Sequence, residues 1–230
     1  MDTIYTDGTY LRNNPHWHAD DSAWKAAHIA RLLERNGVLP RTVCEIGCGA
    51  GAILVSLKEA LPEGTRFTGY DISPNAFAIC SHKVGPCLDF RLGNLLDEDA
   101  HFDLAMAIDV FEHVDDYLQF IKRVKSLAPY KVFHIPLDLS VQSVFRGWPI
   151  MGLRDDVGHI HYFFKQTALS TIEDCGGRVI DHHYTASRLE LPNQGFTSQV
   201  MKLPRRLMFG LSQDFAVRLL GGYSLLVLAK

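Results

Sequence analysis

Three glycines at alternate positions, Gly47, Gly49 and Gly51, follow a short apolar run that contains Glu45. Glycine has no Cβ and adopts positive φ at little cost, so the backbone of this turn can approach a small ligand closely. The residues after the turn have the pattern of a helix, whose unpaired N–H groups and dipole would face that ligand. Asp71 ends a second apolar run, where a carboxylate can accept hydrogen bonds from ribose hydroxyls. The pattern predicts a bound nucleoside.

Polar side chains with acid or base chemistry follow later apolar runs. Asp109 and His113 come after a nearly continuous apolar segment, and His159 and His161 alternate further along the chain. A histidine can act as a general base that removes a proton from a hydroxyl group, so His159 and His161 are catalytic candidates, with Asp138 as a third. Two alternating histidines also suit a metal, but metal sites need a third or fourth ligand and the sequence shows no evident partner. We therefore predict no bound metal, and structural roles for these histidines stay open.

A sheet is needed to bring these residues together. Apolar runs predict strands, and stretches of helical periodicity separate most of them. The predicted strands are 43–46, 67–71, 88–92, 102–108, 131–135, 178–184 and 223–228, and the predicted helices include 52–60, one that starts at Ser73-Pro74, one after Asp115 or Asp116, and 167–175. Strands that alternate with helices predict an α/β fold in which ligands bind beyond the carboxyl ends of the strands.

The glycine turn fits the sequence patterns of two families of nucleotide-binding proteins. Gly47, Gly49 and Ala52 fit the dinucleotide pattern G-x-G-x-x-G/A, which would indicate an NAD-dependent oxidoreductase. The spacing G-x-G-x-G with Glu45 ahead of it resembles instead motif I of the class I S-adenosylmethionine-dependent methyltransferases. A carboxylate beside the turn suits a ligand with a cationic amino-acid end and would repel a pyrophosphate. A protein that binds the nucleoside without catalysis is the third alternative.

A second motif resembles the same methyltransferase family. Residues 109–114, Asp-Val-Phe-Glu-His-Val, are similar to motif IV of members that methylate small molecules such as ubiquinone precursors. The resemblance implies a Rossmann-like, seven-stranded, mostly parallel sheet with an antiparallel last strand and helices on both faces. It implies S-adenosylmethionine as cofactor and methyl transfer to an oxygen or nitrogen of a small-molecule acceptor. The residues expected to bind the cofactor are Glu45, Gly47, Cys48, Gly49, Gly51, Asp71, Ile72, Asn94, Leu95, Asp109, Val110 and His113. Asn94 stands where the family commonly has an acid that binds adenine, and Asp97 is the substitute.

We expect a single domain over residues 1–230. It would consist of an N-terminal arm and lid helix (1–40), a cofactor-binding core (41–184), an insertion (185–222) and a last strand (223–230). The resemblance implies that the arm and its helix cover the cofactor and the substrate, so Tyr10, Trp17 and Trp24 are lid candidates, with packing in the core as the alternative. Residues 137–158 read as a long loop at the ligand edge of the sheet, and Arg146 and Trp148 in it are further substrate-binding candidates.

Composition narrows the range of partners. The net charge of −3 and the pI near 6.4 give no attraction to phosphate backbones, so we expect no nucleic acid. We expect a cytoplasmic protein for three reasons. The five cysteines include no Cys-x-x-Cys pair, the sequence shows no signal peptide, and no apolar run approaches the roughly 20 residues of a membrane span. The insertion is expected to add to the substrate side or to form a homodimer contact. Lys202, Arg205 and Arg206 beside its apolar residues would also suit a membrane surface, although they are few.

Overall fold

The computed structural model describes residues 12, 14, 17, 19–192, 199–200 and 202–230. Its centre is a seven-stranded sheet in the order β3-β2-β1-β4-β5-β7-β6. The strands are β1 Thr42–Ile46, β2 Arg66–Asp71, β3 Leu88–Leu92, β4 Leu104–Ile108, β5 Tyr130–Pro136, β6 Val179–Thr185 and β7 Ser224–Ala229. The strand β7 runs antiparallel to both of its neighbours, while the other pairs are parallel. The predicted fold class is therefore confirmed.

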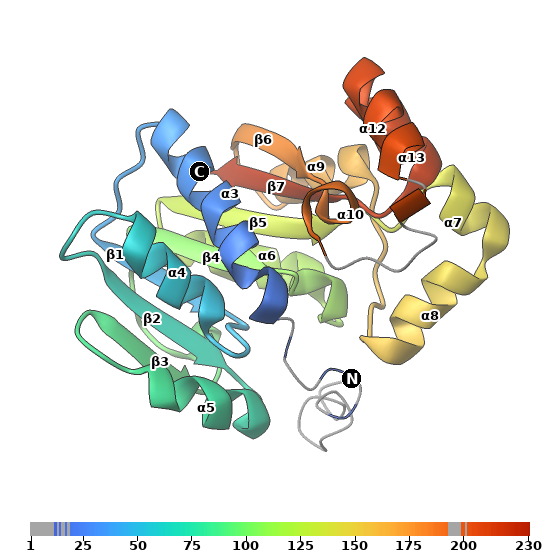
Figure 1. The fold of residues 1–230 in the computed structure, drawn as a ribbon. Helices are drawn as coiled ribbons and strands as arrows, with labels where there is room; N and C mark the ends of the chain where they lie inside the picture. Colours follow the sequence, from blue (N-terminus) through green and yellow to red (C-terminus); the bar gives the residue numbers. More distant parts are fainter. Residues whose placement is uncertain (1–11, 13, 15–16, 18, 193–198, 201) are drawn as a thin grey trace.

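Helices cover both faces of this sheet (Figure 1). The α-helices in and around the sheet are α3 Ser22–Arg35, α4 Ala52–Ala60, α5 Pro74–Cys80, α6 Tyr117–Leu127 and α9 Lys165–Asp174. Short 3-10 helices lie at η1 Ala19–Asp21, η2 Ser81–Lys83, η3 Leu95–Asp97 and η4 Phe111–His113. Helices α3 and α4 pack on one face, and α6 and α9 pack on the other, so β1 and β4 are buried from both sides.

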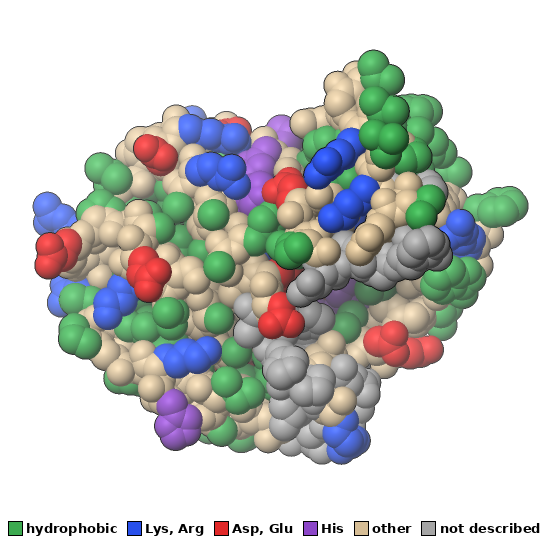
Figure 2. All heavy atoms as spheres, viewed as in Figure 1, with side chains coloured by type: hydrophobic (Ala, Val, Ile, Leu, Met, Phe, Trp, Pro, Cys, Tyr) green, Lys and Arg blue, Asp and Glu red, His purple; other side chains and the backbone are tan. Residues whose placement is uncertain are grey.

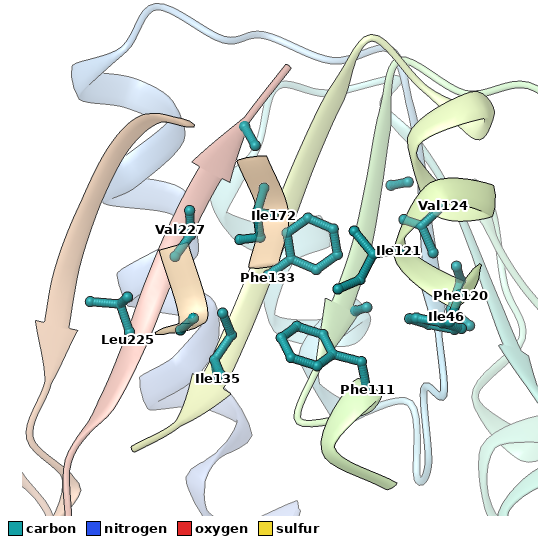
Figure 3. Close-up of a cluster of buried hydrophobic side chains, with 14 of the residues drawn as sticks. Ile46, Phe111, Phe120, Ile121, Val124, Phe133, Ile135, Ile172, Leu225 and Val227 are labelled. Carbon is teal, nitrogen blue, oxygen red and sulfur yellow. The ribbon is translucent and has the colours of Figure 1, made fainter. Parts of the chain in front are cut away.

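Each face of the sheet has its own apolar cluster. On the α6 and α9 face, Phe133 and Val227 meet Ile121 and Ile172, and Phe111 closes the cluster at the end of β4 (Figure 3). On the α3 and α4 face, other buried side chains of the same strands pack on the helices. The alternation arises because successive side chains of a strand point to opposite faces. Packing on both faces thus fixes the positions of the strand ends in the fold.

The start of α5 follows from its sequence. The hydroxyl of Ser73 accepts a hydrogen bond from the N–H of Ala76 at 3.5 Å, and Pro74 occupies the first helical position. Proline fits there because the missing N–H would have no partner in the helix. This helix start therefore agrees with the sequence prediction.

Two regions contain more helix than the sequence predicted. Residues 137–158 are not one loop, since they form α7 Val141–Arg146 and α8 Trp148–Asp156. Ser140 and Ser143 form a capping box at the start of α7, a local signal that the apolar pattern did not reveal. The predicted insertion contains α10 Ser187–Glu190, α12 Lys202–Leu211 and α13 Gln213–Leu220. None of the helices in the described part of the chain has both the length and the apolar character needed to cross a bilayer.

Candidate functional site

The glycine turn lies at the carboxyl end of β1. The N–H groups of Gly47 and Cys48 both donate to the carbonyl of Tyr70 on β2, at 2.8 and 3.0 Å, which fixes the turn to the neighbouring strand. Gly47 has φ +69°, and a Cβ there would lie 2.8 Å from Cγ2 of Val110. Gly51 has φ +71°, and a Cβ there would collide with the ring of Phe90. Glycine is therefore required at both positions for conformation and for space.

Asp71 is tied to the same turn. Its Oδ2 accepts from the N–H of Gly49 at 2.8 Å, and its Oδ1 accepts from the N–H of Ser73 at 2.8 Å. Burial raises the pKa of this carboxyl, and the two backbone hydrogen bonds act against that rise. Each carboxylate oxygen has more than one lone pair, so Asp71 keeps acceptor capacity for a ligand.

A cavity of about 210 Å³ opens between the glycine turn, the end of β4 and α3. Its lining includes ten of the predicted site residues: Trp17, Glu45, Gly47, Cys48, Gly49, Asp71, Ile72, Asp109, Val110 and His113. The carboxyl ends of β1, β2 and β4 meet at this cavity, as expected for a ligand site in an open α/β sheet. The structure therefore brings most of the predicted cofactor residues to one place.

Several predicted residues lie elsewhere. Gly51 precedes α4 beneath the turn, and Leu95 is buried in the apolar core. The side-chain oxygen of Asn94 accepts from the N–H of Leu96 at 3.1 Å, so it caps η3. These three residues do not line the cavity, and their contacts with the cofactor stay predictions. Tyr10 lies outside the described residues.

The two substrate candidates in residues 137–158 are on helices at the surface. Arg146 ends α7 and is exposed, and Trp148 begins α8 with 69% of its surface exposed. Neither residue lines the cavity. Their contact with an acceptor stays a prediction.

Lys25 lines the cavity, although no sequence pattern pointed to it. Its Nζ lies 2.9 Å from Oδ2 of Asp109 and 3.0 Å from Oδ2 of Asp21. Burial alone would lower the pKa of Lys25, but the two carboxylates outweigh burial and raise it, so the side chain is a cation. Lys25 belongs to α3, far from the recognised motifs in sequence, and only the packing of α3 on the sheet reveals it.

Asp109 is held between two partners. Besides Lys25, it faces Nδ1 of His134 on β5, which lies 2.6 Å from its Oδ1. Burial alone would raise the pKa of Asp109, but His134 and Lys25 reverse this effect and lower it, so the group is a carboxylate. The backbone of Asp109 has φ +54°, a conformation that non-glycine residues rarely adopt. These partners hold Asp109 at the wall of the cavity.

Glu45 brings a third carboxyl group to the same wall. It is almost fully buried, and within the described residues its Oε2 has no hydrogen-bond partner. Burial raises the pKa of Glu45 well above its usual value, while nearby Lys25 acts to lower it. An unpaired buried oxygen in a cavity wall is costly unless a ligand supplies a donor.

The predicted catalytic residues His159 and Asp138 are paired. Nδ1 of His159 lies 2.7 Å from Oδ2 of Asp138, and both side chains are largely buried. The ring of His113 lies edge-on to the ring of His159, with 4.8 Å between their centres. Because His113 also lines the cavity, it connects the cavity with the His159–Asp138 pair. His161 differs, since its Nε2 is 3.0 Å from the carbonyl oxygen of Val114 and its ring packs on Tyr117.

Glu112 completes a group that the sequence did not reveal. It is fully buried, and neither of its carboxyl oxygens has a hydrogen-bond partner in the described part of the chain. Glu112, His113 and His159 each offer a potential ligand atom, and these atoms all lie within 4.8 Å of one another. Two imidazoles and one carboxylate could hold a divalent ion. Glu112 thus supplies the third potential ligand that the sequence did not reveal. The absence of a bound metal stays a prediction.

Comparison with known proteins identifies the family. Residues 16–174 match the model of a methyltransferase domain family. A ubiquinone biosynthesis O-methyltransferase of Actinobacillus pleuropneumoniae is 23% identical over 48% of this chain and 54% of its own length. A norajmaline N-methyltransferase of Rauvolfia serpentina is 26% identical over 45% of this chain and 38% of its own length. The chain thus spans about half or less of the length of these curated relatives.

A solved structure supports the fold assignment. The magnesium protoporphyrin IX methyltransferase of Synechocystis, crystallised with S-adenosylhomocysteine, superposes with a TM-score of 0.60 at 18% identity and covers 90% of this chain and 82% of its own. The family match favours S-adenosylmethionine over the nicotinamide cofactor that the glycine pattern also allowed. With its glycine turn, seven-stranded sheet and matching domain, this chain belongs to the class I S-adenosylmethionine-dependent methyltransferases.

Proposed function

We propose that this chain binds S-adenosylmethionine in the cavity and catalyses methyl transfer to an oxygen or nitrogen of a small-molecule acceptor. When bound, the cofactor supplies an electrophilic methyl group carried by a sulfonium. The cavity suits such a ligand, because Gly47 leaves the backbone accessible and Glu45 presents an unpaired oxygen among the described residues. Two relatives of this chain are named for O-methylation and N-methylation, which supports both kinds of acceptor atom.

The charges of the cavity suit the two ends of the cofactor. Asp71 is placed at the glycine turn, where its carboxylate can accept hydrogen bonds from ribose hydroxyls. Lys25 is the one lysine or arginine among the described lining residues, and it suits a carboxylate. The carboxylate of Asp109 suits an ammonium group, and Oε2 of Glu45, which has no partner among the described residues, can accept a hydrogen bond from it. An amino-acid end that carries both charges would be held by these three side chains.

The His159–Asp138 pair carries the catalytic part of the proposal. Asp138 accepts a hydrogen bond at Nδ1 of His159, which leaves Nε2 to take a proton from the acceptor. The protein would thus remove a proton, orient the acceptor and exclude water, without a covalent intermediate. A general base contributes about 10²–10⁴-fold in rate, and this matters more for a hydroxyl acceptor than for an amine that only has to be neutral. A base at His159 would therefore matter most if the acceptor is a hydroxyl.

Substitution of the two histidines tests the base. We expect His159→Gln to lower kcat with a hydroxyl acceptor by about 10²–10⁴-fold, with little change in affinity for S-adenosylhomocysteine. His161→Gln is the matched control, since His161 lies two residues away and bonds to a backbone carbonyl. Methyl transfer would be measured with radiolabelled cofactor over a panel of phenols, alcohols and amines. Equal losses in both variants, or none in His159→Gln, would contradict the assignment of His159.

Calorimetric titration tests the cofactor separately. We expect S-adenosylhomocysteine to bind and NAD not to bind, and we expect Asp71→Ala to weaken the binding about tenfold or more. Asp99→Ala is the control, because that side chain is fully exposed. Binding of NAD alone would overturn the methyltransferase proposal. Tight binding of S-adenosylhomocysteine without transfer to any acceptor would favour a non-catalytic role.

A further inference from the structure

The helix α12 carries an apolar stripe on its outer side. Leu203, Leu207 and Leu211 are spaced four residues apart and therefore share one face of the helix. Their side chains are 66%, 62% and 88% exposed, which is unusual for consecutive members of one stripe. In Figure 2, hydrophobic side chains cover the projection at the upper right, where Figure 1 places α12 and α13. The face that would normally be buried is turned to the solvent.

Contacts on the inner side of α12 fix this orientation. The guanidinium of Arg205 is buried and donates to the carbonyls of Gly221 and Leu220, at 2.8 and 3.1 Å. The ring of Phe209 stacks on Tyr223, with 5.1 Å between the centres and 4° between the planes. Residues 205 and 209 therefore anchor the helix, and a rotation that buried the leucines would break these contacts. The contacts of Arg205 and Phe209 therefore hold the leucine stripe of α12 toward the solvent.

The apolar surface extends beyond α12. Ser212 caps α13 directly after Leu211, and Phe215 in the first turn of α13 is largely exposed. Helix α13 packs against α7, which adds the exposed side chains of Val144 and Phe145. We call α12 and α13 together, Lys202 to Leu220, the helical hairpin. Its exposed apolar residues and those of α7 lie on helices that pack against one another.

The charge of the helical hairpin is opposite to that of the chain as a whole. Arg205 is buried, so the cations of the helical hairpin that reach its surface are Lys202, Arg206 and Arg218; against one carboxylate, Asp214, they give a net charge of +2. The whole chain has a net charge of −3. Arg206 and Arg218 are exposed. A second copy docked through the same surface would bring two positive regions together, which disfavours a symmetric dimer at this place.

We propose that the helical hairpin is a membrane-docking surface that binds anionic lipid bilayers. Leucine and phenylalanine side chains enter the boundary of the acyl chains, while the exposed arginines contact phosphate groups of the lipids. Interfacial helices combine an apolar face with flanking cations in this way. The docked protein would lie on the bilayer without crossing it, with the surface formed by α7 next to the lipid. This surface would give apolar acceptors dissolved in the membrane a short route to the enzyme.

Co-sedimentation with vesicles tests this proposal. We expect the protein to bind vesicles of phosphatidylglycerol and phosphatidylcholine, and to bind vesicles of phosphatidylcholine alone much more weakly. Leu203→Ser/Leu207→Ser should weaken binding to the anionic vesicles more than tenfold. Arg206→Gln should weaken it about fivefold, with a larger effect at low salt than at high salt.

A matched variant keeps the test specific. Val84→Ser/Leu92→Ser removes two exposed apolar side chains near β3, which is the opposite edge of the sheet from β6. We expect this variant to bind vesicles like the wild type. Circular dichroism and titration with S-adenosylhomocysteine would confirm that every variant is folded.

Three results would overturn the proposal. The first is equal binding of the wild type and of Leu203→Ser/Leu207→Ser to anionic vesicles. The second is equal binding of the wild type to anionic and neutral vesicles. The third is a dimer in analytical ultracentrifugation that disappears in Leu203→Ser/Leu207→Ser, together with no vesicle binding, since this would assign the surface to a second copy of the chain.

Discussion

Gly51 is the residue at which the glycine turn has least space. Its φ of +71° disfavours any side chain, and a Cβ would also meet Phe90. We expect Gly51→Ala to lower the free energy of unfolding by about 3 kcal/mol or more, and to weaken cofactor binding, because the turn must shift. Gly64→Ala is the control, since Gly64 also has positive φ but has open space around it, and should cost only about 1–2 kcal/mol. Chemical denaturation would measure both, and equal costs would contradict the steric explanation.

The ion pair of Lys25 gives a prediction with a defined pH dependence. The pKa of Asp109 is lower in the folded protein than in the unfolded chain, so its contribution to stability is present above pH 4 and is lost as the pH falls. Lys25→Met should lower the free energy of unfolding by about 3 kcal/mol at pH 7, because a buried carboxylate loses a partner. The difference from the wild type should shrink below pH 4. Lys122→Met, an exposed change on α6, is the control, and a difference that does not vary with pH would contradict the assignment.

At the scale of elements, a histidine pair joins α3 to β6. Nδ1 of His28 lies 3.0 Å from Nε2 of His183, and Nε2 of His28 lies 2.9 Å from Oε2 of Glu190. Burial, with Arg35 and His28 nearby, lowers the pKa of His183 to about 4. Because this value lies below the usual 6.5, the stabilisation is present above pH 6.5 and is lost as the pH falls toward 4. The two rings share one hydrogen bond, which protonation of both would break.

Substitution of His183 tests this connection. The free energy of unfolding of the wild type should fall between pH 6.5 and pH 4, and the part due to His183 is about 2 kcal/mol after allowance for its partial exposure. His183→Gln should flatten the profile over this range. His101→Gln is the control, since His101 is exposed. Denaturant titrations at several pH values would show whether the flattening is specific to His183.

The elements also show what the sequence could predict. Local signals were sufficient for the turn at Gly47 and for α5, because glycine conformation and the Ser73-Pro74 cap depend on neighbouring residues. Helices α7 and α8 were missed, because they leave large apolar residues exposed and therefore lack the usual pattern of a buried face. Lys25 and Glu112 were missed for another reason. Lys25 matters because it contacts Asp109, which is distant in the sequence. Glu112 matters because it is buried without a hydrogen-bond partner among the described residues. No local sequence pattern predicts either property.

At the scale of the whole molecule, the two apolar clusters share their strands. On β7, Leu225 and Val227 belong to the cluster with α6, while Leu226 and Leu228 belong to the cluster with α3. The two faces should therefore unfold together, in one transition by tryptophan fluorescence and by circular dichroism. Leu226→Ala should cost about 2–5 kcal/mol and move both signals equally. Separate midpoints in the variant would show that the faces are independent.

The position of β7 between β5 and β6 also has a consequence for synthesis on the ribosome. The strand β6 has no pairing partner in the sheet until Ser224–Ala229 has been translated, because its partner is β7. Until then the nascent chain exposes β5 as a bare sheet edge, with β6 and the helical hairpin already made but not yet anchored. Such edges attract other strands and chaperones. We therefore expect pairing of β7 to be a late step of folding during synthesis, and the time taken to translate residues 179–229 to determine how long the edge of β5 stays unpaired.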